Sequence, residues 1–468
     1  MSDADAARDA LRAAWDDMLA DLTRARDAID SPELMPAPGN ERNLAEGYRY
    51  LMGFAHSAIE RAFFEDPRFP TFRHALQILN KGTIDNADAI YFMAPIDGRA
   101  SHVVRGHVGD HRHWRGEPPA SDGPKAPRYL IFETTDGCIA GDSGSLTELR
   151  PGVKVQTGRI DSRELQVDAA GRFEILLAPE RPDGHTGNFL CTHRRTSRPH
   201  PDEPEGSPDR YACYVSGRQL FDDWEHEEPS ALTITRIDAA ATAPEPLDAS
   251  FAAAQIRRLG SLVNGQMRFW NEFYTVLLET YGKQGAKSGD DESERFMPRN
   301  KFNEPNAASG ATGGGQSTNI YAGGVWELDD DEALLIESRT VVEPDYRGMN
   351  LSNLWGESLD YANHQTSLTA HQAATDSDGA VRYVVAHRDP GVANWLDTTG
   401  HREGFLNPRW TYTEQPPREQ WPTISARKIR FDEIRSELPD DVRTVTPAER
   451  DECIGIRREH VQRRFRVF

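Results

Sequence analysis

The stretch DPGVANWLDT at residues 389–398 decides how this chain is expected to fold, because a second version of it, RPDGHTGNFLCT, stands at residues 181–192. Each version places an asparagine, Asn188 or Asn394, four residues before a threonine. Each also follows an Asp-x-x-Gly turn and an apolar run: DAAG (168–171) with FEILL (173–177), and DSDG (376–379) with YVV (383–385). Agreement in order and spacing over this length is typical of a duplicated unit. The sequence therefore predicts two related β domains.

The duplication separates scaffold residues from functional candidates. An Asp-x-x-Gly segment suits a tight turn, because glycine tolerates a positive φ and the aspartate bonds nearby backbone amides. Asn188 and Asn394 are present in both copies together with Thr192 and Thr398, so we expect them to hold loop backbone in place. Residues that occur in only one copy are the better functional candidates.

Outward from the repeat, the pattern predicts a mainly β chain with α-helical extensions: two tandem jelly-roll or sandwich-like domains joined by a long helix. The expected boundaries are a helical arm at 1–84, a first β domain at 85–245, a linking helix at 246–285, a second β domain at 286–440 and a helical tail at 441–468. Apolar residues spaced by three or four from Ile256 to Leu277 predict the linking helix.

A second helix is predicted in the arm, with Tyr48, Leu51 and Ile59 on its apolar face. Asn40 or Asn43 is its expected cap, and Pro67 is its expected end.

Composition excludes several classes of partner. The 468 residues carry a formal charge of −21, which opposes binding to nucleic acid or to anionic membrane surfaces. There is no run of 18 apolar residues, and the acidic start of the chain lacks the pattern of a signal peptide, so a cytoplasmic location is expected. The four cysteines show no C-x-x-C spacing. We therefore predict no disulfide scaffold, no metal and no other cofactor.

The second β block resembles a known family. ALLI (333–336), the Leu351-x-Asn353-Leu-Trp355 pattern, SLDY (358–361), DPGVANWLDTTG (389–400) and RW (409–410) are similar to the family called domain of unknown function 1214, over about residues 318–412. NLAEGY (43–48) and DNAD (85–88) resemble the amino-terminal regions of bacterial proteins that carry this domain. The resemblance implies an all-β, jelly-roll-like body, which often occurs as one of two tandem domains. It implies no reaction, so function has to come from the residues.

The candidate site lies in a polar segment of the second copy, residues 345–364. Asp360 and His364 are predicted to form an acid/base pair, with Tyr361 as a hydrogen-bond donor. The predicted substrate-binding residues are Tyr346, Asn353, Glu357, Arg409, Trp410 and Trp270. His401 is expected at the same end of the domain as Arg409 and Trp410. The alternative interpretation of this segment is a polar strand edge with capping contacts.

Two functions remain open. The first is an enzyme that acts by acid/base chemistry on a hydrophobic small molecule of the isoprenoid, steroid or aromatic alcohol type, as a lyase, hydratase, isomerase or hydrolase. The alternative is a carbohydrate-binding or oligomeric assembly module, for which Trp326, Trp355 and Trp410 would have to be exposed. The helical arms predict a homo-oligomer. The histidines between His102 and His113 are expected at a polar rim rather than on a metal.

Overall fold

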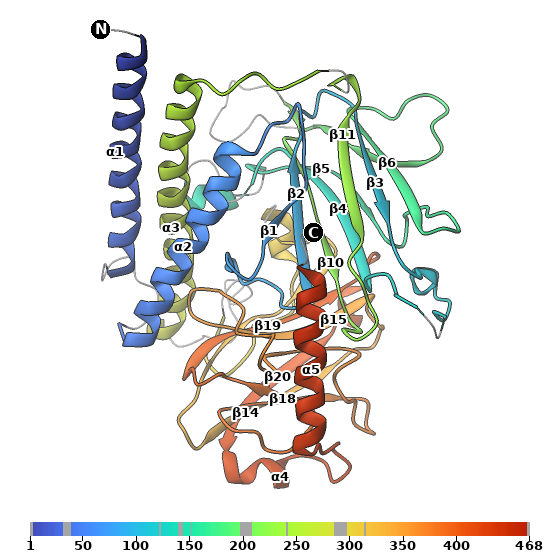
Figure 1. The fold of residues 1–468 in the computed structure, drawn as a ribbon. Helices are drawn as coiled ribbons and strands as arrows, with labels where there is room; N and C mark the ends of the chain where they lie inside the picture. The colour runs from blue at the N-terminus through green and yellow to red at the C-terminus, as the bar shows by residue number, and fades with distance from the viewer. Residues whose placement is uncertain are drawn as a thin grey trace.

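The structure is a computed structural model that describes residues 3–30, 39–120, 123–138, 144–150, 152–196, 208–239, 242–284, 297–312 and 315–465. Four large sheets and five α-helices make up most of it (Figure 1). This mainly β architecture with helical extensions is the one that the sequence predicts. No helix in these ranges is both long enough and apolar enough to cross a membrane.

The first pair of sheets lies between residues 73 and 236. Its strands are β1 (Arg73–Leu76), β2 (Ala89–Pro95), β3 (His102–His107), β4 (Tyr129–Thr135), β5 (Gln156–Asp161), β6 (Arg172–Ala178), β7 (Asn188–Cys191), β10 (Tyr214–Leu220) and β11 (Ala231–Arg236). One sheet has the order β1-β2-β10-β4-β5 and the other β11-β3-β6-β7. A hairpin of β8 (His193–Arg195) and β9 (Asp209–Tyr211) extends from it. Strand structure thus begins at residue 73, before the predicted boundary at 85, because β1 pairs with β2.

The second pair follows between residues 319 and 430. Its strands are β12 (Asn319–Tyr321), β13 (Gly324–Glu327), β14 (Glu332–Arg339), β15 (Tyr346–Ser352), β16 (Ser367–Thr369), β17 (Val381–Ala386), β18 (Trp395–Asp397), β19 (Glu403–Thr411) and β20 (Thr423–Arg430). One sheet has the order β12-β19-β15-β16, with β13 also on β19, and the other β18-β17-β14-β20.

The two pairs have the same strand order. The series β11-β3-β6-β7 corresponds to β20-β14-β17-β18, and β2-β10-β4-β5 corresponds to β12-β19-β15-β16. The series β11-β3-β6-β7 ends in a parallel pair, β6 with β7, and the series β20-β14-β17-β18 ends in the parallel pair β17 with β18. The other neighbouring strands in these two series pair antiparallel. The repeat in sequence is therefore also a repeat in topology.

The two repeated asparagines make the same hydrogen bonds. The amide of Asn188 accepts from the backbone nitrogen of Gln166 (2.7 Å) and donates to the Gln166 carbonyl and to a carbonyl of β6. Asn394 bonds both backbone groups of Ala374 in the same way (2.7 Å each) and donates to a carbonyl of β17. Both side chains are buried, so they satisfy backbone groups that water cannot reach. This is the scaffold role expected of residues shared by the two copies.

Three long helices pack together beside the sheets (Figure 1): α1 (Asp3–Asp30), α2 (Glu41–Phe63) and α3 (Ala249–Gln284). The side chain of Asn40 caps α2, as one of the two predicted caps. The predicted apolar face of α2 is partly wrong, since Tyr48 and Ile59 are exposed. The buried face is rotated and runs through Tyr50, Leu51 and Phe54, because α2 packs against both α3 and the second pair of sheets.

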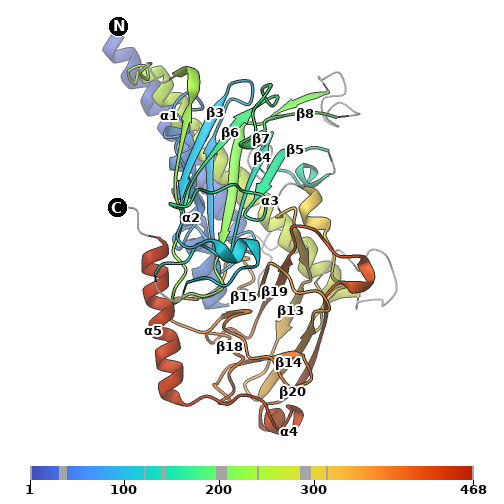
Figure 2. The same cartoon turned by 90° about the vertical axis from the view of Figure 1, so that its right-hand side faces the viewer.

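The last helices are α4 (Ile434–Glu437) and α5 (Pro447–Arg464). Helix α5 lies along both pairs of sheets (Figure 2). Near its start, Arg450 donates to the carbonyl of Val392 in the second pair (2.8 Å), and near its end Arg463 donates to that of Trp224 in the first (2.9 Å). Between them, Arg457 is fully buried and bonds the carbonyl of Tyr361 (3.2 Å). Short 3-10 helices occur at Arg112–Arg115, Leu146–Leu149, Ile237–Ala239, Ala308–Thr312, Arg418–Gln420 and Phe431–Glu433.

Candidate active site

Polar side chains from three segments meet beside the start of α2. The segments are the first turns of α2, the turn that follows β15 and the turn that follows β18. Asn353 shapes the second segment, because its side-chain oxygen accepts from the backbone nitrogens of Trp355 (3.1 Å) and Glu357 (3.0 Å). The Trp355 indole then donates to the carbonyl of Asn43 on α2 (2.8 Å). This bond fixes the turn against the helix.

Two carboxylates and an amide form the centre of the site. The Asn353 amide donates both to Glu46 on α2 (3.0 Å) and to Glu357 (2.8 Å), so it bridges the two acids. The other oxygen of Glu46 lies 2.8 Å from Nε2 of His401. The glutamate side chains are only 10% and 4% exposed. We call Glu46, Asn353, Glu357 and His401 the carboxylate site.

The surroundings move the pKa values of the two acids in opposite directions. Burial raises the pKa of Glu357, and the charge of Arg49 and the hydrogen bonds from Arg49 and Asn353 offset this only in part. Burial also acts to raise the pKa of Glu46, but the hydrogen bond and charge of His401, with the charges of Arg49 and Arg42, leave it below its ordinary value. Opposite pKa shifts in neighbouring acids are one pattern found in sites of general acid/base catalysis.

Arg49 covers Glu357 on the solvent side. Its guanidinium donates to both oxygens of Glu357 (2.5 and 3.3 Å), and its side chain is 60% exposed. Below this pair, the Lys81 ammonium donates to the carbonyls of Ser358 (2.9 Å) and Leu359 (3.1 Å). Burial lowers the pKa of Lys81. Arg49 is therefore the solvent-exposed partner of a buried acid.

A second imidazole–carboxylate pair lies at the exposed end. Nδ1 of His364 is 2.8 Å from Asp397, the last residue of β18. The His364 side chain is 43% exposed. Asp397 also accepts from the backbone nitrogen of Thr399 (2.7 Å), whose hydroxyl lies 2.9 Å from Nδ1 of His401. One short turn thus connects this pair to the carboxylate site.

The backbone is strained at two places around the site. Thr399 has a φ of 51°, and the consecutive residues Thr83 and Ile84 have φ values of 60° and 55°. Positive φ is unfavourable for β-branched residues. Ile84 donates its N–H to the carbonyl of Gly356 (2.9 Å) in the turn that carries Glu357. Both strained segments therefore support the turns that hold the polar residues.

The predicted partner of His364 differs from the one observed. The Asp360 carboxylate accepts from the backbone nitrogens of Ala362 (3.2 Å) and Asn363 (3.1 Å) and from the Asn363 side chain, so it caps its own turn. The hydrogen bond of His364 goes instead to Asp397, 33 residues further along the chain. Tyr361 is buried, and its ring lies 4.3 Å from the Lys81 nitrogen.

The predicted substrate-binding residues fall into three groups. Asn353 and Glu357 belong to the carboxylate site. Tyr346 and Arg409 belong to another buried polar group: Tyr346 donates to Asp88 (2.5 Å), while Arg409 donates to the carbonyl of Ile84 (2.8 Å). The two tryptophans pack against apolar neighbours: Trp410 is buried beside Ile320 and Tyr412, and Trp270 contacts Phe269, Phe273 and Tyr274 on α3. His401 lies in the site, apart from Trp410.

Three polar residues of the site were not predicted: Glu46, Arg49 and Asp397. Glu46 lies within NLAEGY, one of the two amino-terminal stretches singled out by the family resemblance. That stretch was the available signal for Glu46. Neither Arg49 nor Asp397 stands out by spacing, because their partners are 308 and 33 residues away.

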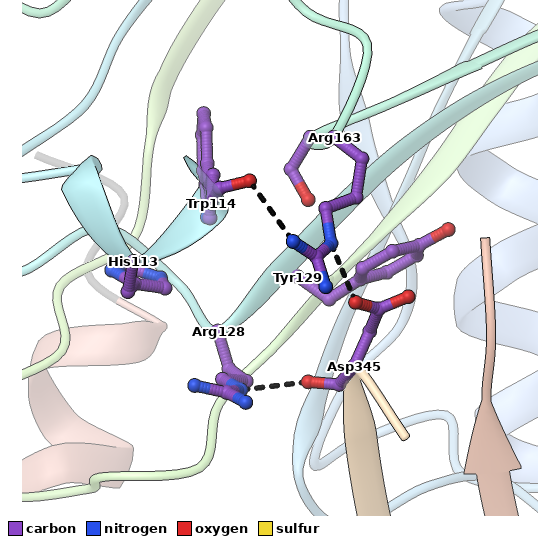
Figure 3. Close-up of a pocket in the computed structure, with 7 residues that line it drawn as sticks. His113, Trp114, Arg128, Tyr129, Arg163 and Asp345 are labelled. Atoms are coloured by element: carbon purple, nitrogen blue, oxygen red, sulfur yellow. Dashed lines mark hydrogen bonds and ion pairs between the residues drawn. The ribbon is translucent and has the colours of Figure 1, made fainter. Parts of the chain in front are cut away.

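Of the histidines between His102 and His113, His102 is fully buried and so does not lie at the expected polar rim, while His111 and His113 both lie against Trp114. Within the described ranges, no group of three or more His, Cys, Asp or Glu side chains could hold a metal ion. Burial lowers the pKa of His113 to about 4. This side chain lines a cavity of about 20 Å³ between the first pair of sheets and β15, where Arg163 donates to Asp345 (2.6 Å) (Figure 3). A space of this size holds one water molecule.

No protein-family model matches this chain, and no curated protein matches it. An uncharacterized protein from Burkholderia cenocepacia with a known crystal structure is 28% identical, and the match covers 91% of this chain and 99% of that one with a TM-score of 0.70. A protein of known structure from Vibrio parahaemolyticus is 11% identical over 86% of this chain and 99% of its own, but its TM-score of 0.39 carries no argument. The Burkholderia protein is thus similar in fold over nearly the whole chain.

Proposed function

We propose that this protein is an enzyme that uses acid/base chemistry on a hydrophobic small molecule. In this proposal Glu357 is the proton donor and Glu46, paired with His401, is the proton acceptor. The observation that carries it is the pair of buried glutamates on one amide, with one pKa raised and the other lowered. The reaction belongs to the lyase, hydratase, isomerase or hydrolase classes.

Proton transfers in both directions fit this arrangement. In an elimination, the Glu46 carboxylate would take a proton from carbon while Glu357, in its protonated form, donates its proton to the departing hydroxyl, which leaves as water. Glu46 then carries the extra proton and Glu357 a negative charge, and exchange with solvent restores both. Hydration is the same sequence in reverse. His364 is the second acid/base candidate, oriented by Asp397 rather than by Asp360.

An apolar surface next to Arg49 supports a hydrophobic substrate. Met52 is exposed one helical turn from Arg49, and Ile78 and Leu79 are exposed in the segment that packs on α2 at Gly53. A methyl group placed on Gly53 would lie 2.8 Å from the Leu79 carbonyl oxygen, so helix and segment are in direct contact. Exposed apolar side chains that form a contiguous patch are typical of binding surfaces.

Deuterium exchange tests this proposal without knowledge of the product. The full-length protein is incubated in deuterated water with a panel of isoprenoids, steroids and aromatic alcohols, and ¹H NMR detects incorporation or turnover. Glu357→Gln and Glu46→Gln should each lower the rate by at least ~100-fold, the usual contribution of a general acid or base. Glu403→Gln is the matched control, because burial also raises the pKa of Glu403 but this residue pairs with Arg299 outside the site. Full activity in both site variants would overturn the assignment.

The carbohydrate-binding alternative loses its expected surface. Trp326, Trp355 and Trp410 are at most 1% exposed, and stacking on sugars requires an exposed ring face. We further infer from the matching strand orders that the two pairs of sheets derive from one jelly-roll-like unit.

A further inference from the structure

The two sides of the first pair of sheets differ. On one side the edge strands contact each other: the Thr157 hydroxyl of β5 donates to the carbonyl of Cys191 on β7 (3.1 Å), and Arg194 donates to the carbonyl of Gln156 (3.1 Å). On the other side the second sheet ends at β11, which among the described strands pairs with β3 alone. β11 lies at the front of the molecule in Figure 1. This strand is therefore an edge.

The hydrogen-bond phase shows which groups of β11 face outward. Ile237 donates its N–H to the carbonyl of Ser101 (3.0 Å), in the same register as the strand pairing. Hydrogen-bonded pairs alternate in an antiparallel ladder, so Thr233 and Thr235 bond to β3. Leu232, Ile234 and Arg236 then direct their N–H and C=O groups away from the sheet. Among the described residues, these outward backbone groups have no hydrogen-bond partner.

The corresponding edge of the second pair is protected by charge. β20 carries Arg427, Lys428 and Arg430, and charged side chains of this kind prevent edge strands from pairing with other chains. In β11 the only charged residue is Arg236, which pairs with Asp238 (2.6 Å), as the three β20 residues pair with Glu437, Glu332 and Asp331. Thr233 and Thr235 are exposed on the outer face. The same topological edge thus carries three charged side chains in the second copy and one in the first.

We propose that β11 pairs antiparallel with β11 of a second copy of this chain, about a two-fold axis at Ile234. In that register Thr233 of each copy lies opposite Thr235 of the other copy, which gives two threonine pairs. Cross-strand threonine pairs are favourable. The Arg236 residues of the two copies are about 13 Å apart along the strands, at ~3.3 Å per residue, so they do not oppose pairing. The edge is therefore complementary to itself.

A groove beside β11 could receive a side chain of the second copy. It measures about 570 Å³, and its lining combines Ala231, Leu232 and Phe173 with the polar side chains of Arg105, His107, Asp168, Arg172 and Glu174. In the proposed register, Ile237 of one copy lies opposite Ala231 of the other. Ile237 is a large apolar residue that is 50% exposed in the single chain. Pairing would place this side chain at the groove and remove it from water, a favourable change.

Sedimentation velocity of the full chain at micromolar concentrations tests the proposal. Wild type should be a dimer, and Thr233→Lys with Thr235→Lys should raise the dimer dissociation constant at least ~100-fold, because lysines then face lysines across the axis. Both positions are exposed, so the monomer should keep its fold and thermal midpoint. Ser425→Lys on the β20 edge is the matched control and should stay dimeric. A monomeric wild type, or a double variant that dimerises as tightly as wild type, would overturn the proposal.

Discussion

Replacement of Glu357 by glutamine should change how the stability of the protein depends on pH. Burial raises the pKa of Glu357 in the folded state, whereas the unfolded chain has the ordinary value, 4.5. Between these two values the folded state holds more protons than the unfolded state, so the free energy of unfolding falls as pH rises. The contribution of Glu357 is fully present below 4.5 and is lost above the raised pKa.

The magnitude follows from proton linkage. One proton difference changes the free energy of unfolding by about 1.4 kcal/mol per pH unit within the window. Glutamine does not titrate, so Glu357→Gln should remove up to this slope at pH values above 4.5. The charge of Arg49 acts on the ionised carboxylate and already contributes to this pKa, so its loss adds no separate cost outside the same pH window.

Glu46→Gln is the matched variant, with the opposite sign. The pKa of Glu46 is lowered in the folded state, so its contribution is present above 4.5 and is lost as pH falls through the lower, folded value. Urea denaturation of wild type and both variants across the acid and neutral range measures the three curves. A difference between wild type and Glu357→Gln that is constant with pH would refute the raised pKa, and with it the proposed proton donor.

Four further substitutions test the structure. Asn188→Ala and Asn394→Ala should each lower the free energy of unfolding by ~2–4 kcal/mol in urea titrations, because each leaves buried backbone groups unpaired, whereas the exposed Asn363→Ala should change it by less than ~0.5 kcal/mol. Arg457→Ala should lower the free energy of unfolding by ~3 kcal/mol, whereas Arg458→Ala at the exposed neighbouring position should lower it by ~0.5 kcal/mol. Equal losses for the two variants in guanidinium denaturation would contradict the bridging role of α5. Thr83→Gly should raise the thermal midpoint, because glycine adopts a φ of 60° without the ~1–2 kcal/mol of strain that threonine has there. The added chain entropy of glycine in the unfolded state costs less than this strain. A lower midpoint would argue against strain at Thr83.

Sequence reasoning reached the elements whose signals are local or repeated. The matching turns and asparagines predicted two related β units, and the strand orders agree with that expectation. Asn353 and Glu357 were selected because they occur in one copy only. The partner of His364 could not be predicted from local spacing. Asp360 is four residues away in sequence but bonds its own turn, whereas the observed partner, Asp397, is placed beside His364 by strand β18. The face of α2 was also misjudged, because a helix that packs on two sides buries residues outside a single apolar stripe.

The path of α5 has a consequence for biosynthesis. The ribosome makes this helix after both pairs of sheets, yet Arg457 and Arg464 enter the space between them, and Arg464 donates to the carbonyl of Ala87 near the start of β2 (2.5 Å). Each pair of sheets can collapse around its own apolar interior as it emerges. These two buried arginines can be placed only after the last helix has been made. A nascent chain stalled before residue 447 should therefore hold its two pairs of sheets together less tightly than the full chain does.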